Sequence, residues 1–241
     1  MVKAKHRLCV DCELSPGSKV PLGAESAHYV SRVLRLKTGD ELICFNGDGY
    51  SYLSTIMETG RRETIVSIES VLEFQTETIR IHLVQSLIKR MDTLLQKTTE
   101  LGVTDIWLMQ SERSEVHVSD TRLQQKFRHW RAVMQSACEQ SGRNRIPRLN
   151  PPLRYAELLN QLPCSHGYIL DPGGAPFSPD AQPTDTVIMV GPEGGWTDVE
   201  LQKAQASGLR TSCLGTNTLR ADTAPLTALA IVQHTWAWRY A

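Results

Sequence analysis

One glycine-rich stretch carries residue types whose spacing suits ligand binding. Val187 to Val190 is an unbroken apolar run, which predicts a strand buried on both faces of a parallel sheet. Gly191-Pro192-Glu193-Gly194-Gly195-Trp196 follows at once, and its glycines and proline end the strand. Because glycine has no Cβ, main-chain N–H groups in such a turn can approach a ligand closely. A tight strand-to-helix turn without a ligand is the alternative that this spacing leaves open.

A second loop of the same kind follows further along the chain. Leu214-Gly215 leads into an irregular stretch that ends at Arg220, and Pro225 suits the first turn of a helix. A capping box at Thr197 and Glu200 predicts another helix between the two loops. Ligands of parallel sheets usually bind in the crevice at the carboxyl ends of adjacent strands. We therefore expect both loops to border one site.

Both loops resemble motifs of one enzyme family. Val190 to Trp196 and Leu219-Arg220-x-x-Thr223-Ala224 are similar to motifs of the small-subunit (16S) rRNA uracil-N3 methyltransferases of the SPOUT superfamily. Further blocks of this family occur in the same order and spacing, at Gln96 to Val103, Ser111 to Ser114, Arg128 to Trp130 and Glu139 to Arg143. The resemblance implies an enzyme that transfers a methyl group from S-adenosylmethionine to N3 of a specific uridine in 16S rRNA.

The same resemblance implies the fold. Residues 75–241 are expected to form a SPOUT-type α/β domain, with a parallel sheet flanked by helices, a trefoil knot that holds S-adenosylmethionine, and a homodimer. Residues 1–74 are expected to form a PUA-like, RNA-binding β-barrel domain. The residues themselves support the first expectation, because strand 79–87, helix 90–101 and strand 103–109 alternate as in a parallel sheet.

Smaller elements can also be predicted from local patterns. In the N-terminal part we expect strands at 6–14, 41–45, 50–57 and 64–72, a helix at 24–34, and a hairpin turn at Asn46-Gly47-Asp48-Gly49. In the C-terminal part we expect a basic loop at 142–152, a helix at 154–162, and a strand from Tyr168 that ends in a glycine turn at 171–174.

The resemblance also indicates which residues form the site. Cofactor-binding residues are expected to be Leu170, Val190, Gly191, Pro192, Glu193, Gly194, Gly195, Leu214, Gly215, Thr218, Leu219 and Ala224. Uracil N3 must lose its proton, which leaves negative charge that a fixed guanidinium stabilises, and Arg220 is the candidate for this catalytic role. A structural salt bridge from Arg220 to Asp222 or Glu193 is the alternative.

The proton acceptor is less clear from the sequence. Glu193 is the second catalytic candidate, but neither Glu193 nor Asp222 is a convincing general base, and solvent can take the proton. The sequence also departs from the family here, with Asn217-Thr218 in place of arginine-isoleucine and Asp222 in place of glutamate. No role is therefore carried over to Asn217, and no base role to Asp222.

Charge is balanced over the chain but not evenly distributed. Lys plus Arg and Asp plus Glu number 26 each, whereas the segment from Arg122 to Arg148 is strongly basic. Such a stripe can hold phosphates, although a charged helix face is more often only solvated. Candidate RNA-binding residues, from this stripe, the family blocks and the N-terminal part, are Arg7, Arg32, Arg35, Arg113, Gln140, Arg143 and Arg145.

Several other functions are disfavoured. Cys9-x-x-Cys12 has no second cysteine pair, so we expect no metal site. No apolar run approaches membrane-spanning length and no signal peptide is evident, so we expect a cytoplasmic protein. No Lys-Ser/Thr follows the glycines, which excludes a P-loop. Two alternatives stay open: another SPOUT enzyme that methylates ribose 2′-OH or a tRNA guanine, and a non-catalytic rRNA-binding assembly factor.

Overall fold

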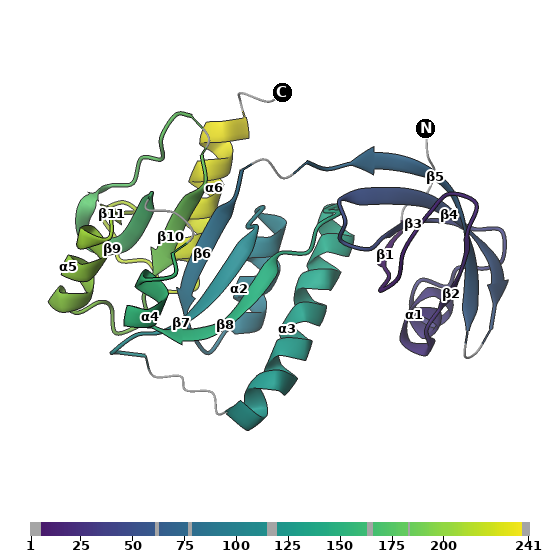
Figure 1. Cartoon of the computed structure of the whole chain (residues 1–241), viewed down its shortest axis with the longest axis horizontal. Coiled ribbons are helices and arrows are strands. Elements are labelled where there is room, and N and C mark those ends of the chain that lie inside the picture. Colours follow the sequence, from purple (N-terminus) through teal and green to yellow (C-terminus); the bar gives the residue numbers. More distant parts are fainter. Residues whose placement is uncertain are drawn as a thin grey trace. The chain divides into compact units, whose positions relative to one another are not determined.

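The structure is a computed structural model that describes residues 6–60, 63–76, 79–114, 120–162, 166–182 and 184–237. The chain forms two compact units, coloured along the sequence in Figure 1. The first comprises Met1–Thr76 together with Cys138–Ile146, and the second comprises Glu77–Ala137 and Pro147–Ala241.

The first unit is built on a five-stranded sheet. Its order is β1 (Arg7–Cys9), β3 (Glu41–Phe45), β4 (Tyr50–Thr59), β5 (Thr64–Phe74) and β2 (Lys19–Leu22). β1 runs parallel to β3, and the other neighbours are antiparallel. Fully buried Leu42, Ile56 and Ile68 lie in its core cluster. β2 was not predicted, because a proline such as Pro21 disfavours a strand. The structure tolerates Pro21 because β2 lies at the edge of the sheet.

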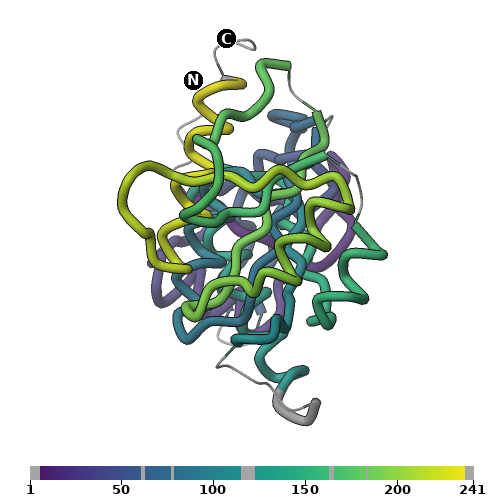
Figure 2. Tube along the Cα trace, turned by 90° about the vertical axis from the view of Figure 1, so that its left-hand side faces the viewer, coloured from purple at the N-terminus to yellow at the C-terminus, as the bar shows by residue number. Residues whose placement is uncertain are grey.

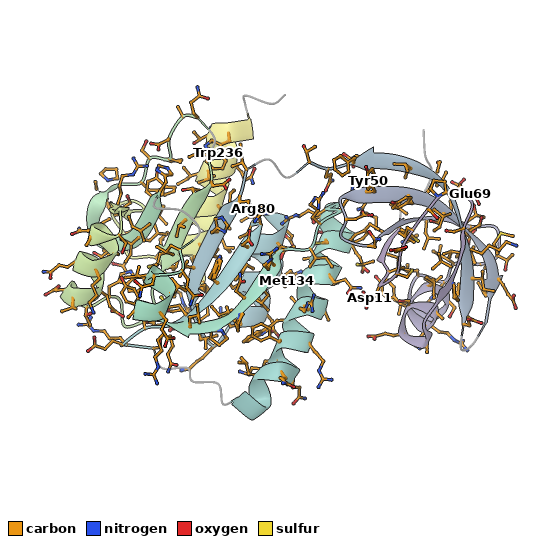
Figure 3. The ribbon with its side chains drawn as sticks, in the orientation of Figure 1. Asp11, Tyr50, Glu69, Arg80, Met134 and Trp236 are labelled. Atoms are coloured by element: carbon orange, nitrogen blue, oxygen red, sulfur yellow. The ribbon has the colours of Figure 1, made fainter. Side chains whose placement is uncertain are left out.

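The predicted hairpin and helix of this unit have different outcomes. The hairpin is confirmed: β3 and β4 pair around Gly47 and Gly49, which both have positive φ. At its end the ring of Tyr50, labelled in Figure 3, lies 4.4 Å from that of Phe74. The helix expected at 24–34 instead divides into α1 (Ala24–His28) and a π-helical turn, η1 (Tyr29–Val33).

The second unit is a six-stranded parallel sheet with helices on both faces, which confirms the predicted α/β class. Its order is β11 (Leu209–Cys213), β9 (Gly167–Pro176), β10 (Thr186–Val190), β6 (Ile81–Ser86), β7 (Asp105–Gln110) and β8 (Arg148–Arg154). The helices are α2 (Met91–Glu100), α3 (Asp120–Ser141), α4 (Tyr155–Leu159), α5 (Asp198–Ala206) and α6 (Ala224–Ala237).

Two apolar layers hold this sheet. On one face, Val84, Val187 and Met189 pack against residues of α4 and α5 in one buried cluster. On the other face, α2 and α6 lie against each other, and Figure 1 shows both helices behind the sheet. The indole Nε1 of Trp236, labelled at the end of α6 in Figure 3, donates to the carbonyl of Asp180 at 3.1 Å. None of the described helices is long and apolar enough to cross a membrane.

Two local predictions in this unit are wrong. The expected basic loop at 142–152 contains the start of β8, and its prolines, Pro151 and Pro152, are tolerated because β8 is an edge strand. The expected glycine turn at 171–174 is part of β9, which continues past a register shift with β11. A Cβ at Gly174 would lie 2.5 Å from the amide nitrogen of Ser212. This glycine therefore allows close strand approach and does not form a turn.

Candidate active site

A cavity of about 710 Å³ lies in the second unit, at the carboxyl ends of β9, β10 and β11. The loop between β11 and α6 forms one side of it, and Figure 2 shows this loop as the wide yellow-green bend that leads into α6. Most of the predicted residues line this cavity, namely Leu170, Val190, Gly191, Pro192, Glu193, Gly195, Leu214, Gly215, Thr218, Leu219, Arg220 and Ala224. The two loops thus border one site, as their positions after parallel strands predicted.

The glycine loop is shaped by Trp196. Its indole Nε1 donates to the carbonyl of Leu170 at 2.9 Å, which ties the loop after β10 to β9. The ring packs against Gly191, where a Cβ would lie only 2.9 Å from it. Gly195 turns the chain with φ of +67°, and its N–H donates to the carbonyl of Pro192. Glycine is therefore required at 191 for space and favoured at 195 for its backbone conformation.

Helix α5 starts where the capping box predicts. The Thr197 hydroxyl accepts from the N–H of Glu200, and the Glu200 carboxylate accepts from the N–H of Thr197 at 2.9 Å. This reciprocal pair satisfies two donors that the first turn of a helix leaves open. The capping box therefore fixes the residue at which the glycine loop ends and α5 begins.

Gly194 is the one predicted cofactor-binding residue that is not among the residues lining the cavity. This glycine is outside the cavity lining, and a Cβ there would meet Arg113, at 3.0 Å from its Cβ and 3.3 Å from its carbonyl oxygen. A side chain at 194 would therefore press on the segment after β7 and not on a ligand in the cavity. Sequence spacing could not show this, because successive residues of a tight turn point in different directions.

Arg220 has a fixed main chain and an exposed side chain. Its carbonyl accepts from the N–H groups of Thr223 and Ala224, both at 2.9 Å, at the start of α6. The side chain is 73% exposed, and its Nε lies 3.9 Å from a carboxylate oxygen of Asp222. A pair this long and exposed contributes little to stability. The guanidinium is thus positioned at the cavity without being buried in a structural salt bridge.

The segment after β6 is part of the site, although it was not among the predicted site residues. Ile88, Lys89 and Arg90 line the cavity, and Arg90 Nη1 lies 3.7 Å from the other carboxylate oxygen of Asp222. Asp222 therefore lies between two guanidinium groups. The available signal was their position directly after a buried parallel strand, whose carboxyl end belongs to the same crevice. Asn217 also lines the cavity, although it departs from the family pattern.

The arrangement suits a ligand with both apolar and polar parts. The residues that line it include the aliphatic Leu170, Val190 and Leu219, together with the glycines Gly191, Gly195 and Gly215, which bring only main-chain polar groups. Such a mixture is typical of sites for nucleoside-containing cofactors. No group of three or more His, Cys, Asp or Glu within the described residues is placed to hold a metal ion.

Comparison with known proteins assigns the chain to a family. A family model for an RNA methyltransferase domain matches residues 75–233, and one for an RNA methyltransferase PUA domain matches residues 22–69. The chain belongs to this RNA methyltransferase family. A member from Synechocystis, named ribosomal RNA small subunit methyltransferase E, is 31% identical over 93% of this chain and 76% of its own length.

Two solved structures of similar proteins contain S-adenosylmethionine. A putative methyltransferase from Legionella pneumophila is 32% identical, with a TM-score of 0.91 over 98% of this chain and 99% of that one. A ribosomal RNA small subunit methyltransferase E from Neisseria gonorrhoeae is 33% identical, with a TM-score of 0.88 over 96% of this chain and 98% of that one. The cofactor is bound in both of these relatives.

The candidate RNA-binding arginines of this family member fall into two groups. Arg7 and Arg145 are engaged inside the first unit: Arg7 donates to the carbonyl of Arg143 and to the Asn144 side chain, and Arg145 Nε donates to the carbonyl of Gln75 at 3.2 Å. Burial lowers the pKa of Arg7, while nearby carboxylates, chiefly Glu73, act against it. These two side chains hold residues 143–145 to the N-terminal strands.

The other candidates are placed differently. Arg32 and Arg35 are exposed, at η1 and just beyond it, and Arg35 has φ of +57°, which is unusual for a residue with a side chain. Gln140 is exposed near the end of α3, and Arg143 is half-buried. Arg113 donates to main-chain carbonyls of the glycine loop. The side chain of Arg122, at the start of the basic stripe, lies outside the described residues.

Proposed function

We propose that this protein transfers the methyl group of S-adenosylmethionine to N3 of a specific uridine in 16S ribosomal RNA. One observation carries the proposal: the glycine loop, the loop before α6 and Arg220 border a single cavity at the carboxyl ends of the strands. Membership of an RNA methyltransferase family supports the reaction class, and the names of its relatives support the small-subunit rRNA substrate.

The residues present fit the proposed cofactor. Leu170, Val190 and Leu219 would bury the adenine, and the main chain at Gly191 and Gly215 would hold the ribose. When bound, S-adenosylmethionine supplies an activated methyl group. The protein then has to orient the uracil, exclude water and stabilise charge.

Arg220 is the residue we assign to charge stabilisation. N3 lies on the Watson–Crick edge of uracil, so the base has to be unpaired or flipped before it enters the cavity. Loss of the N3 proton leaves an anion, and a guanidinium in the cavity wall stabilises it most in a site that excludes water. Because Asp222 lies between Arg220 and Arg90, we assign it to spacing these two cations and not to proton transfer. Glu193 stays the second catalytic candidate, from its place in the lining.

The decisive experiment identifies the product. The protein is incubated with labelled S-adenosylmethionine and either naked 16S rRNA or assembled small subunits, and the RNA is digested to nucleosides. Labelled 3-methyluridine is expected. A ribose-methylated nucleoside or a methylguanosine would assign the enzyme to another SPOUT activity, and no labelled nucleoside from either substrate would favour an assembly factor.

The partners and cellular site are part of the same proposal. We propose that the enzyme works in the cytoplasm as a homodimer whose SPOUT domain is knotted, with residues 75–241 catalytic and residues 1–74 contacting RNA. Each site would then draw on both chains. Light scattering at working concentration should give twice the monomer mass. A fully active protein at the monomer mass would contradict the dimer.

A further inference from the structure

Arg113 contacts the glycine loop from outside the cavity. Its Nη1 donates to the carbonyl oxygens of Gly194 and Trp196, both at 3.1 Å. These carbonyls flank Gly195, the residue with φ of +67° in the turn. One planar guanidinium thus holds both the peptide before Gly195 and the peptide after Trp196.

The turn that carries Arg113 is itself held firmly. Residues 111–114 follow β7, and the buried hydroxyls of Ser86, Ser111 and Ser114 form a chain with oxygen–oxygen distances of 3.0 and 2.9 Å. The Ser114 hydroxyl also accepts from the N–H of Ser111 at 3.1 Å. Arg113 therefore extends from a turn that is anchored to the end of β6.

A second link joins this turn to the start of α5. The N–H of Glu112 donates to the Glu200 carboxylate at 3.0 Å, and the other oxygen of that carboxylate accepts from the N–H of Thr197. Glu200 is only 5% exposed. The last residues of the glycine loop are therefore held between the turn after β7, which supplies two donors, and the ends of β9 and β10.

We propose that Arg113 is a positioning residue for the cofactor, which keeps the glycine loop in its binding conformation without touching the ligand. The inference rests on the proposed cofactor site. A loop with glycines at 191, 194 and 195 has many conformations to lose when it binds. If fewer molecules hold the competent conformation, the apparent dissociation constant rises by the same factor.

This role differs from an RNA contact in its chemistry. A phosphate contact requires only positive charge, so lysine would largely replace arginine, and neutralisation would flatten the salt dependence of RNA binding. Holding two carbonyls with one planar group requires the geometry of arginine, so lysine would replace it only in part. The two roles can therefore be separated by measurement.

The test compares Arg113→Ala, Arg113→Lys and the matched control Glu112→Ala. The control removes a neighbouring exposed side chain and keeps the main-chain N–H that bonds Glu200. Calorimetry with S-adenosylmethionine should give about a tenfold weaker affinity for Arg113→Ala, an intermediate value for Arg113→Lys and the wild-type value for the control. The KM for the cofactor should rise in parallel, while kcat at saturating cofactor stays near wild type.

Three results would overturn the inference. Wild-type cofactor affinity in a folded Arg113→Ala variant would remove the positioning role, as would a lower melting temperature with unchanged affinity. A reduced salt slope of RNA binding that lysine restores, with cofactor affinity unchanged, would assign Arg113 to RNA. If the wild-type protein itself fails to bind S-adenosylmethionine, the proposed function fails, and that result is distinct from the other three.

Discussion

At the scale of single residues, the side chain of Arg220 is the one most directly tied to chemistry. The Arg220 main chain is fixed at the start of α6, and its guanidinium is exposed at the cavity. Arg220→Ala should reduce turnover by roughly two to three orders of magnitude, as when a preorganised charge donor is removed. Cofactor affinity should change little, because the charge matters most when N3 loses its proton.

Two controls separate this role from a structural one. Raising the pH should partly rescue the turnover of Arg220→Ala, because hydroxide then removes the N3 proton and forms the uracil anion that the arginine favoured. Arg220→Lys should rescue poorly, because a point charge does not reproduce the planar fork. Melting curves and pH–rate profiles provide the measurement. A lower melting temperature with weaker cofactor binding and no pH rescue would instead indicate a structural salt bridge.

Gly191 is the glycine of the loop whose substitution should matter most. A Cβ there would lie 2.9 Å from the ring of Trp196, so Gly191→Ala should displace the ring and weaken its hydrogen bond to Leu170. We expect a cost of about 1–3 kcal/mol in unfolding free energy, typical of overpacking, and weaker cofactor binding. Gly23→Ala is the control, because a Cβ there meets nothing within 4 Å. Equal stability and affinity in both variants would contradict this prediction.

At the scale of elements, the sheet of the second unit contains a pH-sensitive buried group. His82 in β6 is 2% exposed, and its Nδ1 lies 3.5 Å from Asp105 in β7. Burial lowers the pKa of His82, while Asp105 and Asp185 act in the opposite direction and Arg80 and Arg148 reinforce the decrease. The folded protein therefore favours the neutral imidazole.

The direction of the pH effect follows from this. Because the folded pKa is below the unfolded value of 6.5, the unfolded chain binds more protons between the two. The stability from His82 is thus complete above about pH 6.5 and decreases as the pH falls below it, by at most about 1.4 kcal/mol per pH unit. Chemical unfolding at pH 7 and pH 5 should show this loss, and His82→Gln should reduce it. An equal loss in the variant would assign the pH dependence to other groups.

At the scale of the whole molecule, RNA affinity should depend on exposed cations and not on those used to build the first unit. Neutralising Arg32 and Arg35 together should weaken RNA binding and flatten its salt dependence, because each phosphate contact releases counterions. Arg7→Ala should mainly lower the melting temperature, because Arg7 holds the 143–145 segment. Binding titrations over a range of salt concentrations measure the first effect, and an unchanged slope would assign Arg32 and Arg35 to solvation.

Local patterns by themselves determined much of this protein. The apolar run before Gly191, the capping box at Thr197 and the hairpin residues from Asn46 to Gly49 each specify their structure through nearest neighbours, so they could be predicted. Alternation of strands and helices indicated the parallel sheet, and the motifs of the glycine loop and the Arg220 loop indicated the family. These signals are short-range, and so are the interactions that produce them.

Only the tertiary structure decided which groups those residues face. Gly194 lies in the predicted motif, yet a Cβ added there would meet Arg113. Arg7 and Arg145 form hydrogen bonds within the first unit, although their charge suggested RNA contacts. Arg90, the residue before α2, joins the site from a part of the chain far away in sequence. Partners of this kind depend on how strands align in the sheet, and no local pattern encodes that alignment. Charge and glycine content mark candidate residues, whereas packing across the sheet determines whether each one faces a ligand, solvent or the protein itself.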